Sequence, residues 1–279
     1  MSKNKRNTVF AIYLAASLAA LPAMGGANLF ELIKQGNIQA VAKAIEADSS
    51  LVNKVVPYHS LPLVMAVDYH KPDIVKLLLD KGANPNAADP RSKRTPMLAL
   101  VQSCGRQPDI FCKMFEMLAE KKVDVNALDP STGWPPVMTL ATYDYYTMKH
   151  VEETKREIDA LLKKGAKINH RGSKARPILV NSFIHFKYDK EKNAPLMAMM
   201  KFLIEKGAKV DDEDENKSTL LIYVLKTDKQ GWPEDAKVEL IKYLISKKAN
   251  LNKKNKQRES PKSILRKNKE LYNKVKGKK

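Results

Sequence analysis

Side chains that carry out chemistry are few in this chain of 279 residues, and they lie far apart. No two histidines share a metal-binding spacing with each other or with a cysteine; the histidines are His59, His70, His150, His170 and His185. The acidic run at 211–215 (DDEDE) lacks the spaced ligands and the turn glycine of a calcium loop. The sequence shows no Ser–His–Asp pattern, phosphate-binding glycine loop or paired-carboxylate motif. We therefore predict no catalytic, metal or cofactor site, and we interpret the acidic run as a solvated loop tip.

The two cysteines, Cys104 and Cys112, are close in sequence and admit two interpretations. We expect Cys104 to end one helix, just before Gly105, and Cys112 to lie in the first turns of an antiparallel partner helix. A short connecting turn can bring two such residues within the ~7 Å between Cα atoms that a disulfide needs. The pair is therefore either a disulfide that joins the two helices or two buried thiols that act as small hydrophobic side chains.

The helices that must position these side chains end in a recurring way. The chain reads LLLDKGANPN at 77–86, LLKKGAKINH at 161–170 and FLIEKGAKVDD at 202–212. In each, a glycine after an amphipathic segment can take the left-handed conformation that stops a helix. Lys122 and Lys248 replace this glycine in two other stretches, so we expect less favourable helix ends there. The Asn or Asp that closes each stretch recurs at intervals of 33, 40, 43, 42 and 41 residues, at Asn53, Asn86, Asn126, Asn169, Asp211 and Asn252. Such a fixed period predicts a solenoid of repeated units.

The helix that follows each stretch also begins in a recurring way, often with proline at its first position. Proline is pre-set for this position, and a preceding Thr or Ser can cap the helix. The starts are Leu61-Pro62-Leu63, Thr95-Pro96-Met97, Pro135-Pro136-Val137, Arg176-Pro177-Ile178, Ser218-Thr219-Leu220 and Ser260-Pro261-Lys262.

Together the two pieces resemble the ankyrin repeat, whose consensus has a T-P-L-H-x-A helix start and a G-A-D-V-N-like helix end. The resemblance covers about residues 28–265, although none of the helix starts keeps the consensus histidine. It implies an all-α ankyrin-repeat solenoid that binds other proteins through its finger loops, inner helices and turns. From this resemblance we expect the finger-tip residues Asn86, Asp89, Arg91, Asp129, His170 and Arg171 to contact a partner.

The central repeats, at about 40–43 residues, are longer than the usual period of about 33. The finger spacing stays at 12–14 residues, whereas the spacing across the helix pair grows from 20 to 26, 29, 30 and 29 residues. Either both helices of the pair or their connecting turn must therefore be longer. The enlarged turns are rich in aromatic residues and predict an elongated ridge that binds a partner; the rings are Tyr143, Tyr145, Tyr146, Phe186, Tyr188 and Trp232. The alternative is that these rings pack inside the longer helix pairs.

Residues 1–27 differ from the rest of the chain. Lys3, Lys5 and Arg6 precede an apolar run at 9–21, and Pro22 and small residues follow. This order predicts a secretory signal peptide cleaved after Gly25 or Ala27, and hence a periplasmic or secreted protein. The alternative is an uncleaved membrane anchor, although the apolar run is shorter than the roughly 20 residues that a spanning helix needs.

We place the repeated units from residue 28 onward and expect them to form one monomeric domain. They are residues 28–57, 58–90, 91–130, 131–170, 171–212 and 213–254, followed by a C-terminal cap with a basic tail at 255–279.

Positive charge is concentrated at the C-terminal end. Of the net charge of +19, residues 247–279 contribute +12 and residues 1–27 contribute +3, which leaves about +4 for the body. The basic segment is either a solvated cap or a site for an anionic surface such as lipid phosphate. Export and the lack of any nucleic-acid motif argue against nucleic acid.

These observations favour an exported, non-catalytic protein–protein interaction module with no cofactor and an unidentified protein partner. The alternative function is an adaptor that binds an anionic surface through the basic tail.

Overall fold

The computed structural model describes residues 27–55, 60–103, 107–142, 148–171, 176–186, 193–227 and 232–277. Within these ranges every regular element is a helix. None of the helices described combines the length and the apolar character needed to cross a bilayer. Contacts divide the chain into unit 1, residues 1–103 and 113–123, and unit 2, residues 104–112 and 124–279.

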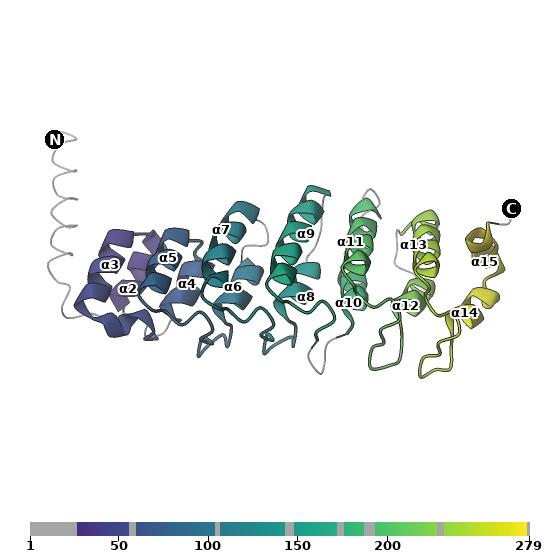
Figure 1. Ribbon diagram of the computed structural model, residues 1–279. Helices are drawn as coiled ribbons and strands as arrows, with labels where there is room; N and C mark the ends of the chain where they lie inside the picture. The colour runs from purple at the N-terminus through teal and green to yellow at the C-terminus, as the bar shows by residue number, and fades with distance from the viewer. Residues whose placement is uncertain are drawn as a thin grey trace, which may run out of the picture. The chain divides into compact units, whose positions relative to one another are not determined.

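Unit 1 is built from stacked helix pairs (Figure 1). Its elements are α2 (Ala27–Gln35), α3 (Ile38–Ala47), the 3₁₀-helix η1 (Ser49–Val52), α4 (Pro62–Asp68), α5 (Pro72–Asp80), α6 (Pro96–Ser103) and the end of α7 (Pro108–Ala119). The first helices of the pairs form one layer, in which α4 packs against α2 and α6, and α3 packs against α5 in the second layer. The first-layer helix α4 is buried along Pro62–Val67 because helices cover it on several sides. The second-layer helix α5 is amphipathic: Ile74 and Leu78 are buried while Lys76 is exposed.

Unit 2 repeats this plan. Its elements are α8 (Pro136–Ala141), α9 (Met148–Lys163), α10 (Ile178–His185), α11 (Asn193–Glu205), α12 (Leu220–Lys226), α13 (Glu234–Ser246), α14 (Pro261–Lys267) and α15 (Lys269–Lys276). The helices α8, α10, α12 and α14 pack in series, and α9 packs on α11 and α13 on α15 in the second layer (Figure 1). The predicted all-α solenoid of helix pairs is therefore confirmed.

The recurring glycines end helices as predicted. Gly82, Gly165 and Gly207 have φ of +89°, +92° and +95°, in the left-handed region that favours glycine. Lys122 and Lys248 adopt the same conformation, with φ of 56° and 66°. Because a Cβ is crowded in this region, these two helix ends carry backbone strain that the glycines avoid.

The recurring asparagines link each finger to the next repeat. In unit 2, the Asn126 Nδ2 donates to the Gly165 carbonyl at 3.1 Å, and the Lys167 N–H donates to the Asn126 Oδ1 at 2.9 Å. Asn53 in unit 1 and Asn169 in unit 2 make the same pair of bonds with the repeat that follows each of them. The asparagine therefore recurs because its amide satisfies one carbonyl and one N–H at the next helix end.

The extra length of the central repeats lies partly in the second helix of each pair. The first helices α4, α6, α8, α10 and α12 have 7, 8, 6, 8 and 7 residues. The second helix lengthens from 9 residues in α5 to 12 in α7, 16 in α9 and 13 in both α11 and α13. The alternative in which both helices lengthen is therefore wrong, because only the second helix of each pair does. The connecting turn also lengthens, from 3 residues between α4 and α5 to 7 between α12 and α13.

Candidate interaction surface

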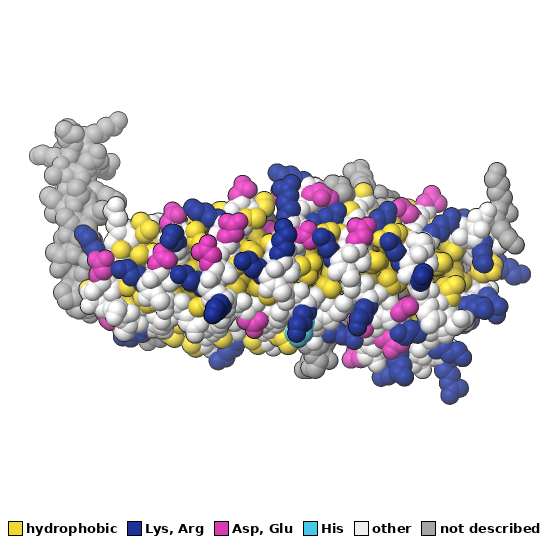
Figure 2. Space-filling model, in the orientation of Figure 1, with side chains coloured by type: hydrophobic (Ala, Val, Ile, Leu, Met, Phe, Trp, Pro, Cys, Tyr) yellow, Lys and Arg dark blue, Asp and Glu magenta, His cyan; other side chains and the backbone are white. Residues whose placement is uncertain are grey.

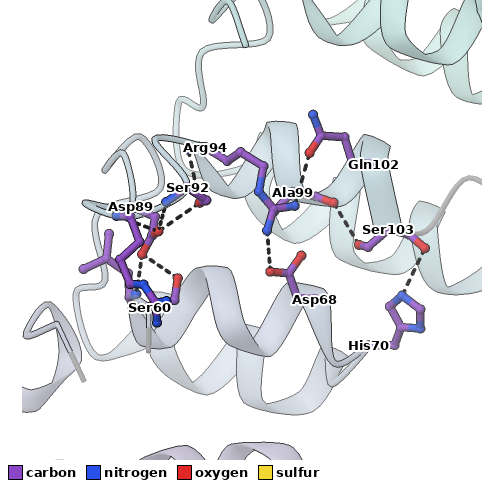
Figure 3. Close-up of polar contacts among 11 residues, drawn as sticks. Ser60, Asp68, His70, Asp89, Ser92, Arg94, Ala99, Gln102 and Ser103 are labelled. Atoms are coloured by element: carbon purple, nitrogen blue, oxygen red, sulfur yellow. Dashed lines mark hydrogen bonds and ion pairs between the residues drawn. The ribbon is translucent and has the colours of Figure 1, made fainter. Parts of the chain in front are cut away.

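The finger between α5 and α6 is organised around one buried carboxylate, Asp89. Its Oδ1 accepts the N–H of Arg91 at 3.1 Å, and the N–H and hydroxyl of Ser92 at 2.7 and 2.9 Å. Its Oδ2 accepts the Ser60 hydroxyl at 2.5 Å and the Leu61 N–H at 3.0 Å, which ties the finger to the start of α4 (Figure 3). Burial by itself would raise the pKa of Asp89, but these hydrogen bonds outweigh it and hold the pKa below its usual value.

Asp129 organises the finger before α8 in the same way. It accepts the N–H groups of Ser131 and Thr132 at 2.9 and 2.8 Å. Asp89 and Asp129 are only 1% and 3% exposed. An aspartate at this position therefore folds its own turn, and the role of Asp89 and Asp129 in binding a partner stays a prediction.

Arg94 joins this finger to both helices of the first layer beneath it. Its Nη2 lies 2.8 Å from the Asp68 Oδ2 on α4, and its Nη1 donates to the Gln102 Oε1 on α6 at 3.2 Å (Figure 3). Burial raises the pKa of Asp68, and the neighbouring guanidinium offsets only part of that effect. In the turn after α4, the His70 Nε2 lies 3.2 Å from the Ser103 carbonyl at the end of α6, which fixes the proton on that nitrogen because a carbonyl only accepts.

An open cleft of about 470 Å³ lies between this finger and the first-layer helices of unit 1. One side is apolar, because the rings of Phe30 and Tyr69 meet edge to face with centroids 5.9 Å apart. Tyr69 keeps 37% of its surface exposed. Most of the remaining lining is polar; the cleft is lined by Phe30, Ser60, Met65, Asp68, Tyr69, Asp89, Arg91, Ser92 and Arg94. A lining that combines aromatic rings with polar groups suits an extended segment of another protein.

The other predicted finger residues differ in their roles. Arg91 is exposed and lines the cleft. Asn86 is exposed, and its Nδ2 donates to the Lys122 carbonyl at 3.2 Å, so it belongs to the inter-repeat links. In unit 2, His170 and Arg171 are half-buried, and the Arg171 guanidinium donates to the Glu213 carbonyl at 2.8 Å.

The predicted aromatic ridge is described at two of its six residues. Phe186 is 4% exposed, so its ring packs inside unit 2, and its role in binding a partner stays a prediction. Trp232 is half-buried, with its ring 5.5 Å from that of the buried Phe183. Both agree with the alternative of internal packing. The other four rings, Tyr143, Tyr145, Tyr146 and Tyr188, lie outside the described residues, so the ridge stays a prediction there.

One carboxyl group in unit 2 is buried away from the cleft. Glu157 on α9 is 1% exposed, and neither of its oxygens has a hydrogen-bond partner among the described residues. Burial, together with the nearby charge of Glu153, raises its pKa to about 8. In the described part of the chain, no group of three or more His, Cys, Asp or Glu could hold a metal ion. Cys112 is exposed on α7, whereas Cys104 lies outside the described residues, so the disulfide stays a prediction.

The cleft itself was missed by sequence reasoning. Phe30 and Tyr69 come from different repeats, and neither belongs to a recurring motif. The available signal was weak: a tyrosine directly after the short helix α4, where the chain turns toward the second layer. Only the stacking of α2 on α4 brings the two rings together.

Comparisons with known proteins agree with this architecture. Residues 59–90 match the family model of the ankyrin repeat. No curated protein sequence matches the chain. The crystal structure of the ankyrin repeat domain of Bcl-3, a member of the IkappaB protein family, superposes with a TM-score of 0.64 over 89% of this chain and 97% of that one. At 22% sequence identity this similarity establishes the fold.

Proposed function

We propose that this chain, which is an ankyrin-repeat solenoid, is a non-catalytic protein–protein interaction module that acts outside the cytoplasm. The observation that carries the proposal is the open cleft of unit 1, which is lined by the Phe30–Tyr69 ring pair and by the exposed Arg91. The partner segment that fits it carries an apolar side chain for the ring pair and polar groups that match the polar lining.

The ring pair supports binding for an energetic reason. An aromatic ring buries a large area and loses little side-chain entropy when a partner covers it. Tyr69 is one of four large hydrophobic side chains that are exposed in the described residues, and it is the only aromatic one among them. Its edge-to-face contact with Phe30 holds the ring in place before a partner arrives, which lowers the cost of binding.

The polar groups of the cleft favour binding over catalysis. Asp89 accepts five hydrogen bonds from its own finger and from the start of α4. Asp68 is ion-paired with Arg94. Because both carboxylates are committed to holding the fold, neither is available to transfer a proton to or from a bound molecule.

The proposed location rests on the sequence of residues 1–27. Three basic residues, a short apolar run and small residues follow one another in the order of a secretory signal. Expression of the whole chain in a bacterial host, followed by fractionation and mass spectrometry, tests this. We expect a product outside the cytoplasm that begins near Ala27; a full-length cytoplasmic product would contradict export.

The binding test compares variants of the cleft with a variant remote from it. Partners are captured from the exported fraction of the source cells on the immobilised protein, and the affinity of each is measured by calorimetry. We expect Tyr69→Ser and Arg91→Glu each to weaken binding by tenfold or more. Tyr272→Ser, a half-buried tyrosine on α15, serves as the control. A partner whose affinity is unchanged by both cleft variants would show that the cleft is not the binding site.

A further inference from the structure

The basic C-terminal segment is a folded surface. Residues 253–259 form a finger in which the Asn255 N–H donates to the Glu259 carbonyl at 2.9 Å. The Ser260 and Ser263 side chains then cap α14 reciprocally. The helices α14 and α15 pack on each other and on α12 and α13, with Leu265 and Leu271 buried. The positive charges are therefore held on ordered elements as far as Lys276.

Six cations of this segment project into solvent from one finger and one helix. We call them the cationic face: Lys254, Lys256 and Arg258 on the finger, and Lys262, Arg266 and Lys267 on α14. All six are exposed, and none forms an ion pair with a carboxylate in the described part of the chain. Figure 2 shows basic side chains gathered around this end of unit 2, where Figure 1 places α14.

Both acidic residues of the segment are already neutralised by other lysines. The Glu259 Oε2 lies 2.6 Å from the Lys226 Nζ, and the Glu270 Oε1 lies 2.8 Å from the Lys274 Nζ. Lys253, the remaining lysine of the finger, pairs with Glu213 at 3.2 Å. The cationic face thus keeps its full positive charge, and a nearby anionic surface would meet little like-charge repulsion.

We propose that the cationic face binds the surface of a lipid bilayer that contains anionic phospholipids. Four of the six cations are lysines, which act as mobile point charges and suit a surface of many phosphates. Clusters of four to eight basic residues are typical of attraction to anionic lipid headgroups. Single-stranded nucleic acid would favour aromatic rings on which bases stack, and the nearby Tyr272 is half-buried with the Lys276 Nζ 5.9 Å from its ring centre.

The test measures co-sedimentation of the full chain with two kinds of vesicle. One kind is phosphatidylcholine alone, and the other contains phosphatidylcholine with phosphatidylglycerol. The apolar run at residues 9–21 can bind both kinds, so the readout is the ratio of the partition coefficients on anionic and neutral vesicles. We expect this ratio to exceed about tenfold at low salt and to approach one at high salt.

A charge-reversal variant locates the site. Lys262→Glu, Arg266→Glu and Lys267→Glu together should reduce the ratio by at least about tenfold. The matched control reverses three other exposed lysines, Lys43, Lys54 and Lys167, so the net charge falls equally. Circular dichroism of each variant checks that the helices remain folded, and a Gln variant at the three face positions should reduce the ratio less than the Glu variant.

The outcomes divide cleanly. Loss of the ratio in the face variant alone supports the proposal. An equal loss in the control variant would show a general charge effect and would overturn the proposal. A ratio near one for the native protein at low salt would also overturn it. Binding of labelled single-stranded DNA without any preference for anionic vesicles would overturn it as well. None of these results bears on the cleft of unit 1, whose partner is measured separately.

Discussion

The guanidinium of Arg94 lies 2.8 Å from the carboxylate of Asp68, and this ion pair joins a finger of unit 1 to α4 beneath it. The two side chains are only 23% and 30% exposed, so water screens the pair less than a pair on the open surface. Removing the arginine leaves a partly buried carboxylate without its cation.

Arg94→Ala is therefore expected to destabilise the protein by roughly 1–3 kcal/mol, because Asp68 loses its charged hydrogen bond and Gln102 loses a donor. Urea unfolding followed by circular dichroism measures the change. The control is Lys76→Ala, which removes a solvent-exposed ion pair with Asp80 and should cost clearly less. Equal costs for the two variants would show that Arg94 does not hold the finger.

Asp89→Ala should cost more, about 2–4 kcal/mol, because it removes the acceptor of five hydrogen bonds and leaves the buried Leu61 N–H unsatisfied. The pKa of Asp89 is lowered in the folded state, so its stabilising effect is present above the unfolded pKa and lost as the pH falls through the folded pKa. The difference between native protein and variant should thus shrink in acid. Asp235→Ala, at an exposed position in the first turn of α13, should cost less than about 1 kcal/mol.

Because of Glu157, we expect the free energy of unfolding to fall as the pH rises. Its pKa is raised from 4.5 to about 8 in the folded state, so the folded protein keeps a proton that the unfolded chain releases. The stabilisation that comes from holding this proton is fully present below pH 4.5 and declines between pH 4.5 and 8. Above pH 8 it has been lost, and the stability no longer changes through this group. Glu157→Gln removes this titration and should be more stable than the native protein by about 3 kcal/mol at pH 7, with little difference at pH 4.

Urea midpoints measured from pH 4 to 9 test the Glu157 prediction. Glu152→Gln, on the exposed side of the same helix, is the control for the substitution itself. If the native protein and Glu157→Gln had parallel pH profiles, the Glu157 carboxyl would have to be ionised in the folded state.

Lys122→Gly should stabilise the protein by about 1 kcal/mol, because glycine has no Cβ and adopts the observed φ of 56° without steric crowding. Gly165→Lys is the reciprocal variant and should destabilise by a similar amount. A Cβ at Gly165 would meet nothing within 4 Å, so this change tests the backbone conformation alone. Thermal unfolding measures both, and shifts of the same sign would contradict the prediction.

The fold could be predicted from sequence wherever a local rule decides the structure. A glycine in the left-handed conformation and a proline at the first helical position act within a few residues, and both recur in register. The finger aspartates could not be interpreted in this way. Asp89 looks like a solvated tip in sequence, yet its oxygens turn inward to N–H groups of its own loop and to Ser60.

The candidate surface depends on packing between repeats, which local sequence motifs do not reveal. The edge-to-face contact of Phe30 with Tyr69 exists only because α2 stacks on α4. For the same reason Phe186 was assigned to the surface, although it lies in the interior of unit 2. An aromatic residue in a turn is equally compatible with both locations until its neighbours are known.

The hydrogen bonds made by Asn53, Asn126 and Asn169 determine where in a repeat residues can be inserted or deleted. Each link fixes the step from one finger to the next with two hydrogen bonds, so a residue gained or lost on that edge breaks them. At the opposite end of each helix pair the length is not constant: the second helix varies from 9 to 16 residues. Each repeat therefore has one edge of constant pitch and one edge whose length is adjustable, and variation in length between related chains is expected to accumulate at the second.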